Sequence, residues 1–490
     1  MELDAAHCYR ALRSRDRRFD GRFFTGVTTT GIYCRPVCPA PAPRRENVIF
    51  FPCAAAAEDA GYRPCRRCRP EAAPGTPAWQ GSSAVVSRGL RLIGEGALDG
   101  GTLCELAGRL GIGDRQLRRL FLRHLGASPL SLARARRLHF ARTLLDETDL
   151  PMSEVAFAAG FQSIRQFNYT LRASFGESPR RLRARRRSPE PAEGDAVVLR
   201  LAYRPPLDFE AGLRFLAARA TRGVEQVEGG AYRRTVEIGG KAGSIEVEKG
   251  ADGAHLVLRA RLGDPAGLLE AAERVRRIFD LAADPLRIAS DLELSAGPRL
   301  GPALRSAPGV RVLGAWDAFE LAVRAVLGQQ VSVAGASTLC GRLVAAFGKP
   351  VSLGRGLTHL FPSPDALAAA DVTAIGIPGA RAATVRALAR AVADRTLRLD
   401  AARGLDDAVA RLCQVPGIGE WTAHYIALRA FGEPDAFPAS DLGLRKALAG
   451  GGAPLSAAQV GRLAEAWRPW RAYVAMALWN PLWPGAREGS

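Results

Sequence analysis

Four cysteines near the start of the chain have the spacing of a metal site. They lie in two short elements, Cys34-Arg-Pro-Val-Cys38 and Cys65-Arg-Arg-Cys68, and each pair can place two sulfur atoms on one ion. Zinc is the usual ion for such a set, and it keeps its cysteine ligands deprotonated at neutral pH. The spacing therefore predicts one Zn²⁺ bound by all four thiolates.

Positive charge is concentrated around these cysteines and in the segment that follows. Residues 1–190 hold 32 Arg and Lys against 18 Asp and Glu, a net charge of +14, whereas the remaining residues hold 36 against 31, a net charge of +5. Such a distribution is typical of a protein that binds a polyanion with its first part. Among the arginines near the thiolates, we expect Arg45, Arg63 and Arg67 to contact the backbone of double-stranded DNA.

A helix-turn-helix pattern occurs twice after the cysteines. Residues 103–114 and 115–122 predict two helices joined by a tight glycine turn, and residues 155–163 and 164–172 repeat the arrangement, with a helix over 129–146 between them. One such pattern also occurs in plain helical bundles, but two on one chain suit successive major grooves of DNA. We expect Arg115, Gln116 and Arg165 to contact bases or phosphates.

A third constellation lies near the end of the chain. The turn Pro416-Gly417-Ile418-Gly419 joins two predicted helices, and its glycines would let backbone amides approach a DNA phosphate. Asp441 opens another predicted helix about twenty residues later. Taken alone, an aspartate in this position is better explained as an ordinary surface N-cap.

Three segments resemble known families. The sequences Thr30-Gly-Ile-Tyr-Cys34 and Tyr62-Arg-Pro-Cys65 make residues 1–70 similar to the amino-terminal domain of Ada-type methylphosphotriester repair proteins, and the doubled helical pattern resembles the AraC-type DNA-binding domain. The Ada resemblance implies that Cys34 is both zinc ligand and nucleophile, taking a methyl group from a DNA phosphotriester. A zinc knuckle that only folds the segment is the alternative.

Residues 197–490 resemble the AlkA-like 3-methyladenine DNA glycosylases of the helix-hairpin-helix superfamily. The resemblance rests on AFELAVRAVLGQQVSVA, VPGIGEWTAHYIALRAFG and WRPWRAYVAMALW. It implies that Asp441 is the catalytic carboxylate and that Gly417 and Gly419 bind DNA. The aromatic residues of the base pocket would be Trp421, Tyr425 and Trp479.

Two residues of this chain differ from those of members of the resembled family. The resemblance also implies one cofactor. Gln330 stands where the best-known member of the branch has a leucine wedge that fills the gap left by the flipped base. Trp421 stands where lyase-competent relatives have a lysine, so we expect a monofunctional enzyme. The carbonyl groups of Cys413, Val415 and Gly417 are at the positions that hold a monovalent cation in relatives.

The predicted fold class is multidomain α+β. Strand-like alternation at 197–201, 232–238, 244–248 and 255–259 predicts a small antiparallel sheet, and amphipathic segments at 315–328, 331–347, 364–374, 380–394, 405–413, 420–431 and 456–479 predict a helical domain. We expect a zinc module at 1–77, an all-α double helix-turn-helix module at 78–186 and a linker at 187–196. An AlkA-like α/β subdomain at 197–283 and an all-α helix-hairpin-helix domain at 284–490 would follow.

Together these features predict an alkylation-damage repair glycosylase fused to a methyl-accepting transcriptional regulator. The chain shows neither a signal peptide nor an apolar run long enough to span a bilayer, so a cytoplasmic protein is expected. A role as activator would add RNA polymerase as a partner. The alternatives are a regulator whose glycosylase-like tail only grips DNA, and a glycosylase whose first half is an inert targeting arm.

Overall fold

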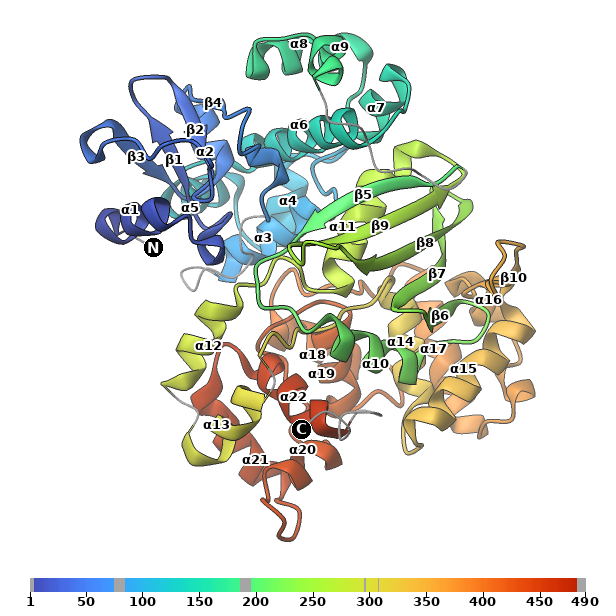
Figure 1. Ribbon diagram of the computed structural model, residues 1–490. Coiled ribbons are helices and arrows are strands. Elements are labelled where there is room, and N and C mark those ends of the chain that lie inside the picture. Colours follow the sequence, from blue (N-terminus) through green and yellow to red (C-terminus); the bar gives the residue numbers. More distant parts are fainter. Residues whose placement is uncertain (1–3, 75–83, 186–194, 295–296, 307, 483–490) are drawn as a thin grey trace. The chain divides into compact units, whose positions relative to one another are not determined.

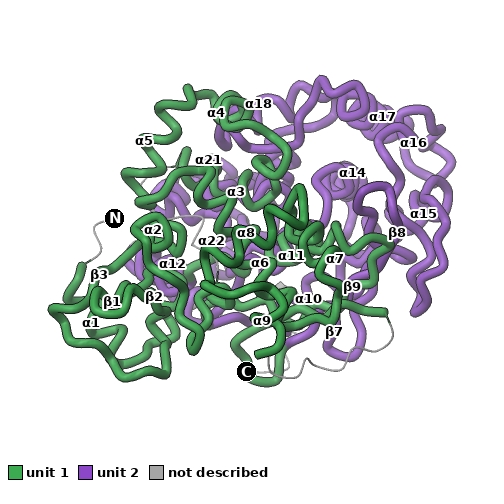
Figure 2. The backbone as a smooth tube through the Cα atoms, turned by 90° about the horizontal axis from the view of Figure 1, so that it is seen from above, with its two compact units in different colours: residues 1–205, 250–276, 281–284 green, residues 206–249, 277–280, 285–490 purple. Residues whose placement is uncertain are grey.

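The computed structural model describes residues 4–74, 84–185, 195–294, 297–306 and 308–482 (Figure 1). They form two compact units, which Figure 2 colours separately. The first unit is Met1–Pro205 with Gly250–Arg276 and Leu281–Asp284, and the second is Pro206–Lys249 with Arg277–Asp280 and Pro285–Ser490. Among the described residues, no helix is long and apolar enough to cross a membrane.

A small sheet forms the start of the first unit. Its strand order is β3-β1-β2-β4, with antiparallel pairs around β1 and a parallel pair between β2 and β4. Tyr33 and Phe24 pack at 5.8 Å between ring centroids over Ala57, which gives this module its core. The elements are α1 (Ala5–Ser14), β1 (Phe24–Val27), β2 (Ile32–Cys34), β3 (Val48–Phe51), α2 (Ala54–Asp59) and β4 (Arg63–Pro64).

Among the described residues of the same unit, seven helices follow before β5. They are α3 (Ala84–Gly94), α4 (Leu103–Arg109), α5 (Asp114–Leu125), α6 (Pro129–Glu147), α7 (Met152–Ala158), α8 (Ile164–Phe175) and α9 (Pro179–Ala184). The helix α5 buries Leu117, Phe121 and Leu125, and α8 buries residues at the same spacing, because positions i, i+4 and i+8 share one helix face. Both helices end at a glycine in the left-handed conformation. The doubled helix-turn-helix prediction is confirmed.

A largely shielded charge network joins the zinc module to α6. Glu58 on α2 accepts a hydrogen bond from the Tyr33 hydroxyl at 2.8 Å and lies 2.8 Å from Nε2 of His139 on α6. At the carboxyl-terminal end of α6, Asp146 pairs with Arg142 at 3.0 Å and with Arg69. The segment that carries the cysteines is therefore fixed to the helix between the two helix-turn-helix motifs.

Two of the strands predicted for the small antiparallel sheet belong to the first unit. In the first unit β5 (Val197–Ala202) pairs antiparallel with β9 (His255–Leu262), and the amide of Arg200 donates to Glu147 at 2.9 Å. The helix α11 (Leu268–Ile278) follows β9. Most of the linker predicted at 187–196 lies outside the described residues.

The second unit contains an antiparallel meander and a large set of helices. The meander consists of β6 (Glu225–Glu228), β7 (Ala231–Ile238) and β8 (Lys241–Lys249). The helices are α10 (Phe209–Arg219), α12 (Pro285–Glu293), α13 (Gly297–Ser306), α14 (Ala318–Leu327), α15 (Val333–Phe347), α16 (Pro364–Ala369), α17 (Gly379–Ala393), α18 (Leu405–Cys413), α19 (Glu420–Arg429), α20 (Leu442–Ala447), α21 (Ala457–Ala464) and α22 (Arg471–Trp479). The α+β prediction is confirmed.

Two details differ from the sequence expectation. The segment predicted as helical over 456–479 is divided between α21 and α22, because Pro469 has no amide proton to continue a helix. The strand β6 was not expected, since its sequence Glu-Gln-Val-Glu is mostly polar. Its Glu225 is nevertheless buried, with a carboxylate 2.8 Å from Arg324 of α14.

We predict that the link between Glu58 and His139 makes the stability of the first unit depend on pH. Burial lowers the pKa of His139, but interaction with the Glu58 carboxylate outweighs this effect and raises the pKa above 6.5. Burial raises the pKa of Glu58, but interaction with His139 helps to hold it below 4.5. The pair therefore stabilises the fold fully between about pH 4.5 and 6.5, and its contribution falls as pH rises through the raised pKa of His139 or drops below that of Glu58.

The measurement is urea unfolding of the wild type and His139→Gln between pH 5 and 9. We expect a difference of about 2 kcal/mol near pH 6 that shrinks toward pH 9. The variant His7→Gln, at an exposed position of α1, serves as the control and should show no such trend. A difference that is constant across this range would contradict the prediction.

Candidate functional sites

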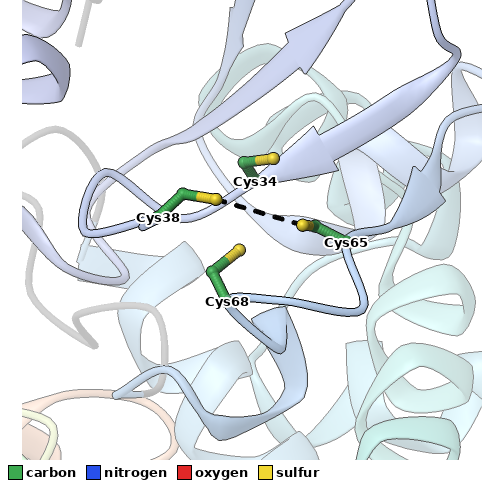
Figure 3. A group of neighbouring side chains, drawn as sticks. All are labelled: Cys34, Cys38, Cys65 and Cys68. Carbon is green, nitrogen blue, oxygen red and sulfur yellow. Dashed lines mark hydrogen bonds between the residues drawn. The ribbon is translucent and has the colours of Figure 1, made fainter. Parts of the chain in front are cut away.

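The four cysteines converge in the first unit. The parallel pairing of β2 with β4 aligns Tyr33 with Pro64, so that Cys34 and Cys65, the residues after these partners, lie close together. The four sulfur atoms all lie within 4.8 Å of one another and point toward a common centre (Figure 3). Tetrahedral zinc bound at about 2.3 Å requires sulfur separations of about 3.8 Å. The cluster therefore fits one zinc ion.

The four sulfur atoms are not equivalent. Cys38, Cys65 and Cys68 are buried, whereas Cys34 is only half-buried. Cys68 also accepts a hydrogen bond from the backbone amide of Arg35 at 3.3 Å, which makes its sulfur a poorer nucleophile. Cys34 is thus the thiolate best placed to meet a substrate from outside.

The predicted DNA-contacting arginines of the zinc module are all exposed. Arg63 lies on β4, and Arg67 lies between the two cysteines of the second element. Arg45 packs over the rings of Tyr9 and Phe50 at 5.7 and 5.6 Å, which limits the positions of its guanidinium.

The predicted reading residues of the helix-turn-helix motifs are also exposed. Arg115 and Gln116 lie in the first turn of α5, and Arg165 lies in the first turn of α8. Sequence reasoning missed Tyr169, which is 76% exposed on the same helix four residues after Arg165. A large aromatic side chain that faces solvent beside Arg165 is a further candidate for contact with DNA.

In the second unit, Asp441 is held by three N–H donors. It is the N-cap of α20, where Oδ1 accepts from the amide of Leu444 at 3.0 Å. The indole of Trp479 donates to Oδ1 at 3.0 Å, and the indole of Trp421 donates to Oδ2 at 3.0 Å. Two indole donors distinguish this carboxylate from an ordinary N-cap.

The aromatic residues predicted for the pocket lie together around this carboxylate. Trp421 and Tyr425 are stacked, with ring centroids 5.5 Å apart and planes inclined by 7°, and Trp479 lies 6.3 Å from Tyr425. Trp467 and Trp470 are buried elsewhere, and Trp470 donates to Asp291. The structure thus brings together the three aromatic residues that were singled out.

The helices α18 and α19 form the predicted hairpin. Gly417 adopts a φ of +87°, and a Cβ there would overlap Thr384 Oγ1, whereas a Cβ at Gly419 would meet nothing within 4 Å. The side-chain amide of Gln329 donates through Nε2 to the carbonyl of Gly417 at 2.9 Å and to Thr422 Oγ1 at 3.0 Å. Sequence reasoning missed this role of Gln329, which anchors its exposed neighbour Gln330 to the hairpin.

Two of the three carbonyls predicted to be cation ligands accept hydrogen bonds. The carbonyl of Val415 accepts the amide of Ile418 at 3.0 Å, and that of Gly417 accepts the Gln329 amide. A carbonyl oxygen has two lone pairs, so each keeps one that these hydrogen bonds do not use.

Four family models match successive parts of the chain. They are the metal binding domain of Ada at residues 7–71, a helix-turn-helix domain at 106–185, the AlkA N-terminal domain at 198–317 and the HhH-GPD superfamily base excision DNA repair protein at 323–471. Their order agrees with the module order expected from the sequence.

Curated relatives support the same arrangement. The "DNA-3-methyladenine glycosylase 2" of Escherichia coli is 36% identical over 57% of this chain and 95% of its own length. The "Bifunctional transcriptional activator/DNA repair enzyme Ada" of the same organism is 31% identical over 44% of this chain and 56% of its own length. A solved 3-methyladenine DNA glycosylase from Archaeoglobus fulgidus has a similar fold, with a TM-score of 0.50 and 21% identity over 57% of this chain and 98% of that chain.

One relative matches this chain over nearly the full length of both proteins. The "Probable bifunctional transcriptional activator/DNA repair enzyme AlkA" of Mycobacterium tuberculosis is 46% identical over 98% of this chain and 97% of its own length. The chain therefore belongs to the family of bifunctional transcriptional activator/DNA repair proteins, in which an Ada-type metal-binding domain and a helix-turn-helix domain precede an AlkA-type glycosylase region.

Proposed function

We propose that the second unit hydrolyses the N-glycosidic bond of alkylated purines such as 3-methyladenine in double-stranded DNA, with Asp441 as the catalytic carboxylate. The observation that carries this proposal is the pair of indole donors on Asp441. Together with the amide of Leu444, they fix the direction of the carboxylate. A fixed negative charge stabilises the positive charge that develops at C1′ as the base departs.

The aromatic residues supply the binding surface for a flipped base. A ring inserted between Trp421 and Tyr425 would need about 6.8 Å between them, twice a van der Waals stacking distance. Their 5.5 Å separation excludes this, so the base stacks on an outer face of the pair or against Trp479. An alkylated purine with a positive charge is already a good leaving group and needs little acid catalysis.

The reaction should stop after base removal. A lyase forms a Schiff base through an amine, and Trp421 stands at the position where lyase-competent relatives of the resembled family have their lysine. The indole of Trp421 donates to Asp441 instead. The product would be an abasic site.

The hairpin and the turn after α14 would hold the DNA. Gly419 has open space around it, which suits the approach of a phosphate to the amides at the start of α19. Gln330, in the left-handed conformation with a φ of +56°, is exposed at the wedge position and can hydrogen-bond the orphaned base. A monovalent cation bound by carbonyls of Cys413, Val415 and Gly417 would add positive charge at this phosphate.

The first unit would act as a methyl acceptor and a sensor. Zinc, when bound, keeps the thiolates deprotonated and nucleophilic. The sulfur of Cys34 attacks the methyl carbon of a DNA phosphotriester, so that an S–C bond forms, the C–O bond breaks and a phosphodiester anion leaves. The four-thiolate site loses one negative charge, which reduces its repulsion of DNA by about 1–4 kcal/mol at a surface dielectric.

The two helix-turn-helix motifs would then direct the modified protein to promoters. Arg115, Gln116 and Arg165 lie exposed at the amino-terminal ends of α5 and α8, where reading helices contact base edges. An activator also engages RNA polymerase, and both partners place the protein in the cytoplasm.

We predict that Asp441→Asn abolishes base release. The asparagine removes the counter-charge and turns an amide N–H₂ toward an indole donor, so release of 3-methyladenine should fall at least a thousandfold while DNA binding is retained. Asp208→Asn, at the N-cap of α10 where the backbone amide of Ala211 is the donor, is the matched control. Single-turnover release measures both, and borohydride should trap no covalent adduct with the wild type. Equal rates for Asp441→Asn and wild type would exclude this role.

We also predict that Cys34 accepts a methyl group. Incubation with DNA that carries methylphosphotriesters should add one methyl group to the peptide containing Cys34, as measured by mass spectrometry. Cys34→Ser should not be methylated and should keep its base-release activity, and the exposed Cys104→Ser is the control that should behave like the wild type. An unmodified Cys34 peptide beside active base excision would reduce the first unit to a DNA-binding arm.

The two hairpin glycines should respond differently to alanine. Gly417→Ala introduces a steric overlap with Thr384 and an unfavourable φ, so we expect a loss of about 2 kcal/mol or more in stability. Gly419→Ala should leave the melting temperature almost unchanged but weaken DNA binding several-fold, because the methyl group occupies the space of a phosphate. Fluorescence anisotropy and thermal unfolding of both variants separate the effects, and unaltered DNA binding by Gly419→Ala would refute the phosphate contact.

A further inference from the structure

The zinc module contacts the carboxyl-terminal end of α5, the reading helix of the first helix-turn-helix motif. Leu125 is the last residue of α5, and its carbonyl oxygen accepts a hydrogen bond from the buried thiol of Cys53 at 3.3 Å. A Cβ on the next residue, Gly126, would lie 3.3 Å from the Cβ of Ala56 and 3.7 Å from Pro52. The last carbonyls of a helix have no partner within it, so a donor from outside can fix this end. The segment that leads into α2 therefore holds the end of α5.

The same module contacts the carboxyl-terminal end of α8, the reading helix of the second motif. Phe175 is the last residue of α8, and its carbonyl oxygen accepts a hydrogen bond from the guanidinium of Arg66 at 3.4 Å. Arg66 also pairs with Glu177, two residues further along the chain, at 3.2 Å. The helix dipole favours a cation at this end of a helix. Arg66 lies between Cys65 and Cys68, so the second cysteine element itself holds the end of α8.

A shielded ion-pair network lies beside the contact with α8. Arg69, the residue after the second cysteine element, pairs with Asp146 at the end of α6 and with Glu71. Arg142 of α6 also pairs with Asp146 at 3.0 Å, and its guanidinium lies 5.7 Å from the ring centre of Phe175. The two carboxylate side chains are 3% and 4% exposed, so solvent screens these pairs only weakly. The end of α8 is thus held to the second cysteine element and to α6 together.

The residues predicted to read DNA lie at the opposite ends of the two helices. Arg115 and Gln116 are in the first turn of α5, and Arg165 is in the first turn of α8. Each helix has 12 residues, and is therefore about 18 Å long. Two helices that are held at corresponding ends by one folded module keep their separation and their angle. The contacts at the carboxyl-terminal ends therefore set the positions of the amino-terminal ends.

We propose that the zinc module is a brace that fixes the separation of α5 and α8 on DNA, and that Arg66 is the positioning residue through which this brace holds α8. The protein then reads two DNA segments at one fixed spacing. The module that carries Cys34 takes part in the choice of promoter by its shape, in addition to accepting a methyl group. The proposal rests on the proposed reading of DNA by both helices.

The test measures how strictly the protein requires this spacing. The probe is the duplex that the wild type, loaded with zinc, enriches most strongly from a pool of random sequences, and footprinting locates its two protected segments. A second duplex carries about five extra base pairs between these segments, which turns one of them to the opposite side of the double helix. Fluorescence anisotropy with the full-length protein gives the ratio of the two dissociation constants, called the spacing ratio.

We expect the wild type to bind the original duplex about thirtyfold more tightly or better, because the second motif cannot reach a segment on the opposite side. Arg66→Ala should lower the spacing ratio by about threefold or more, which is the range of an ion pair with one exposed partner. The variant should fold, because Arg66 is itself 56% exposed and α8 keeps its packing on α7 and α9.

Arg67→Ala is the matched control. Arg67 is the neighbouring exposed arginine and is expected to contact a phosphate, so its loss should weaken binding to both duplexes equally and leave the spacing ratio unchanged. An unchanged spacing ratio for Arg66→Ala, whatever its affinity, would overturn the proposal. A wild type that binds both duplexes equally would instead reject the proposed reading of DNA by two motifs.

A second variant changes the same contact from its other side. Glu177→Gln removes the carboxylate that pairs with Arg66 and leaves both cysteine elements intact, so zinc content and methylation of Cys34 should equal those of the wild type. The spacing ratio should fall as in Arg66→Ala, and the double variant should lower it no further, because the two residues act through one contact. Additive losses in the double variant would contradict the proposal.

Discussion

The carboxylate of Asp441 is the charge around which the second unit is arranged. Three N–H donors from α19, α20 and α22 meet on its two oxygens, so these helices must keep their relative positions for the site to exist. The direction of this carboxylate is set by those donors. The stacking of Trp421 on Tyr425 and the burial of Arg429 follow from the same placement of α19.

Buried ion pairs also connect elements in the interior of the second unit. Arg234 and Arg324 pair with Glu225 and Glu320 in the interior of the second unit, which links the meander to α14. The turn after α14 carries Gln329 and Gln330, so the meander indirectly fixes the segment that contacts the hairpin. Breaking one such buried pair costs more than an exposed pair would, because the remaining charge is left without compensation.

Local spacing allowed much of the site to be predicted. The cysteine elements, the repeated helical pattern and the hairpin followed by Asp441 are short-range features, and the structure brings their residues together. The sequence did not reveal Glu225 as a buried residue or the break between α21 and α22. Arg429 was missed because a charged residue at the end of an amphipathic helix normally faces solvent, and its burial depends on carbonyls more than a hundred residues away. The roles assigned to these residues remain predictions.

The network between Tyr33, Glu58 and His139 bears on how such multidomain chains can be recombined. Glu58 belongs to the cysteine-bearing module and His139 to the helical one, and each is largely shielded from water. A hybrid that took the two modules from different parents would bury one member of the pair without the other, unless both parents carried compatible residues. The two modules can therefore be exchanged, in evolution or engineering, only together with the residues that form the contacts between them. Their sequences, in contrast, look like independent domains.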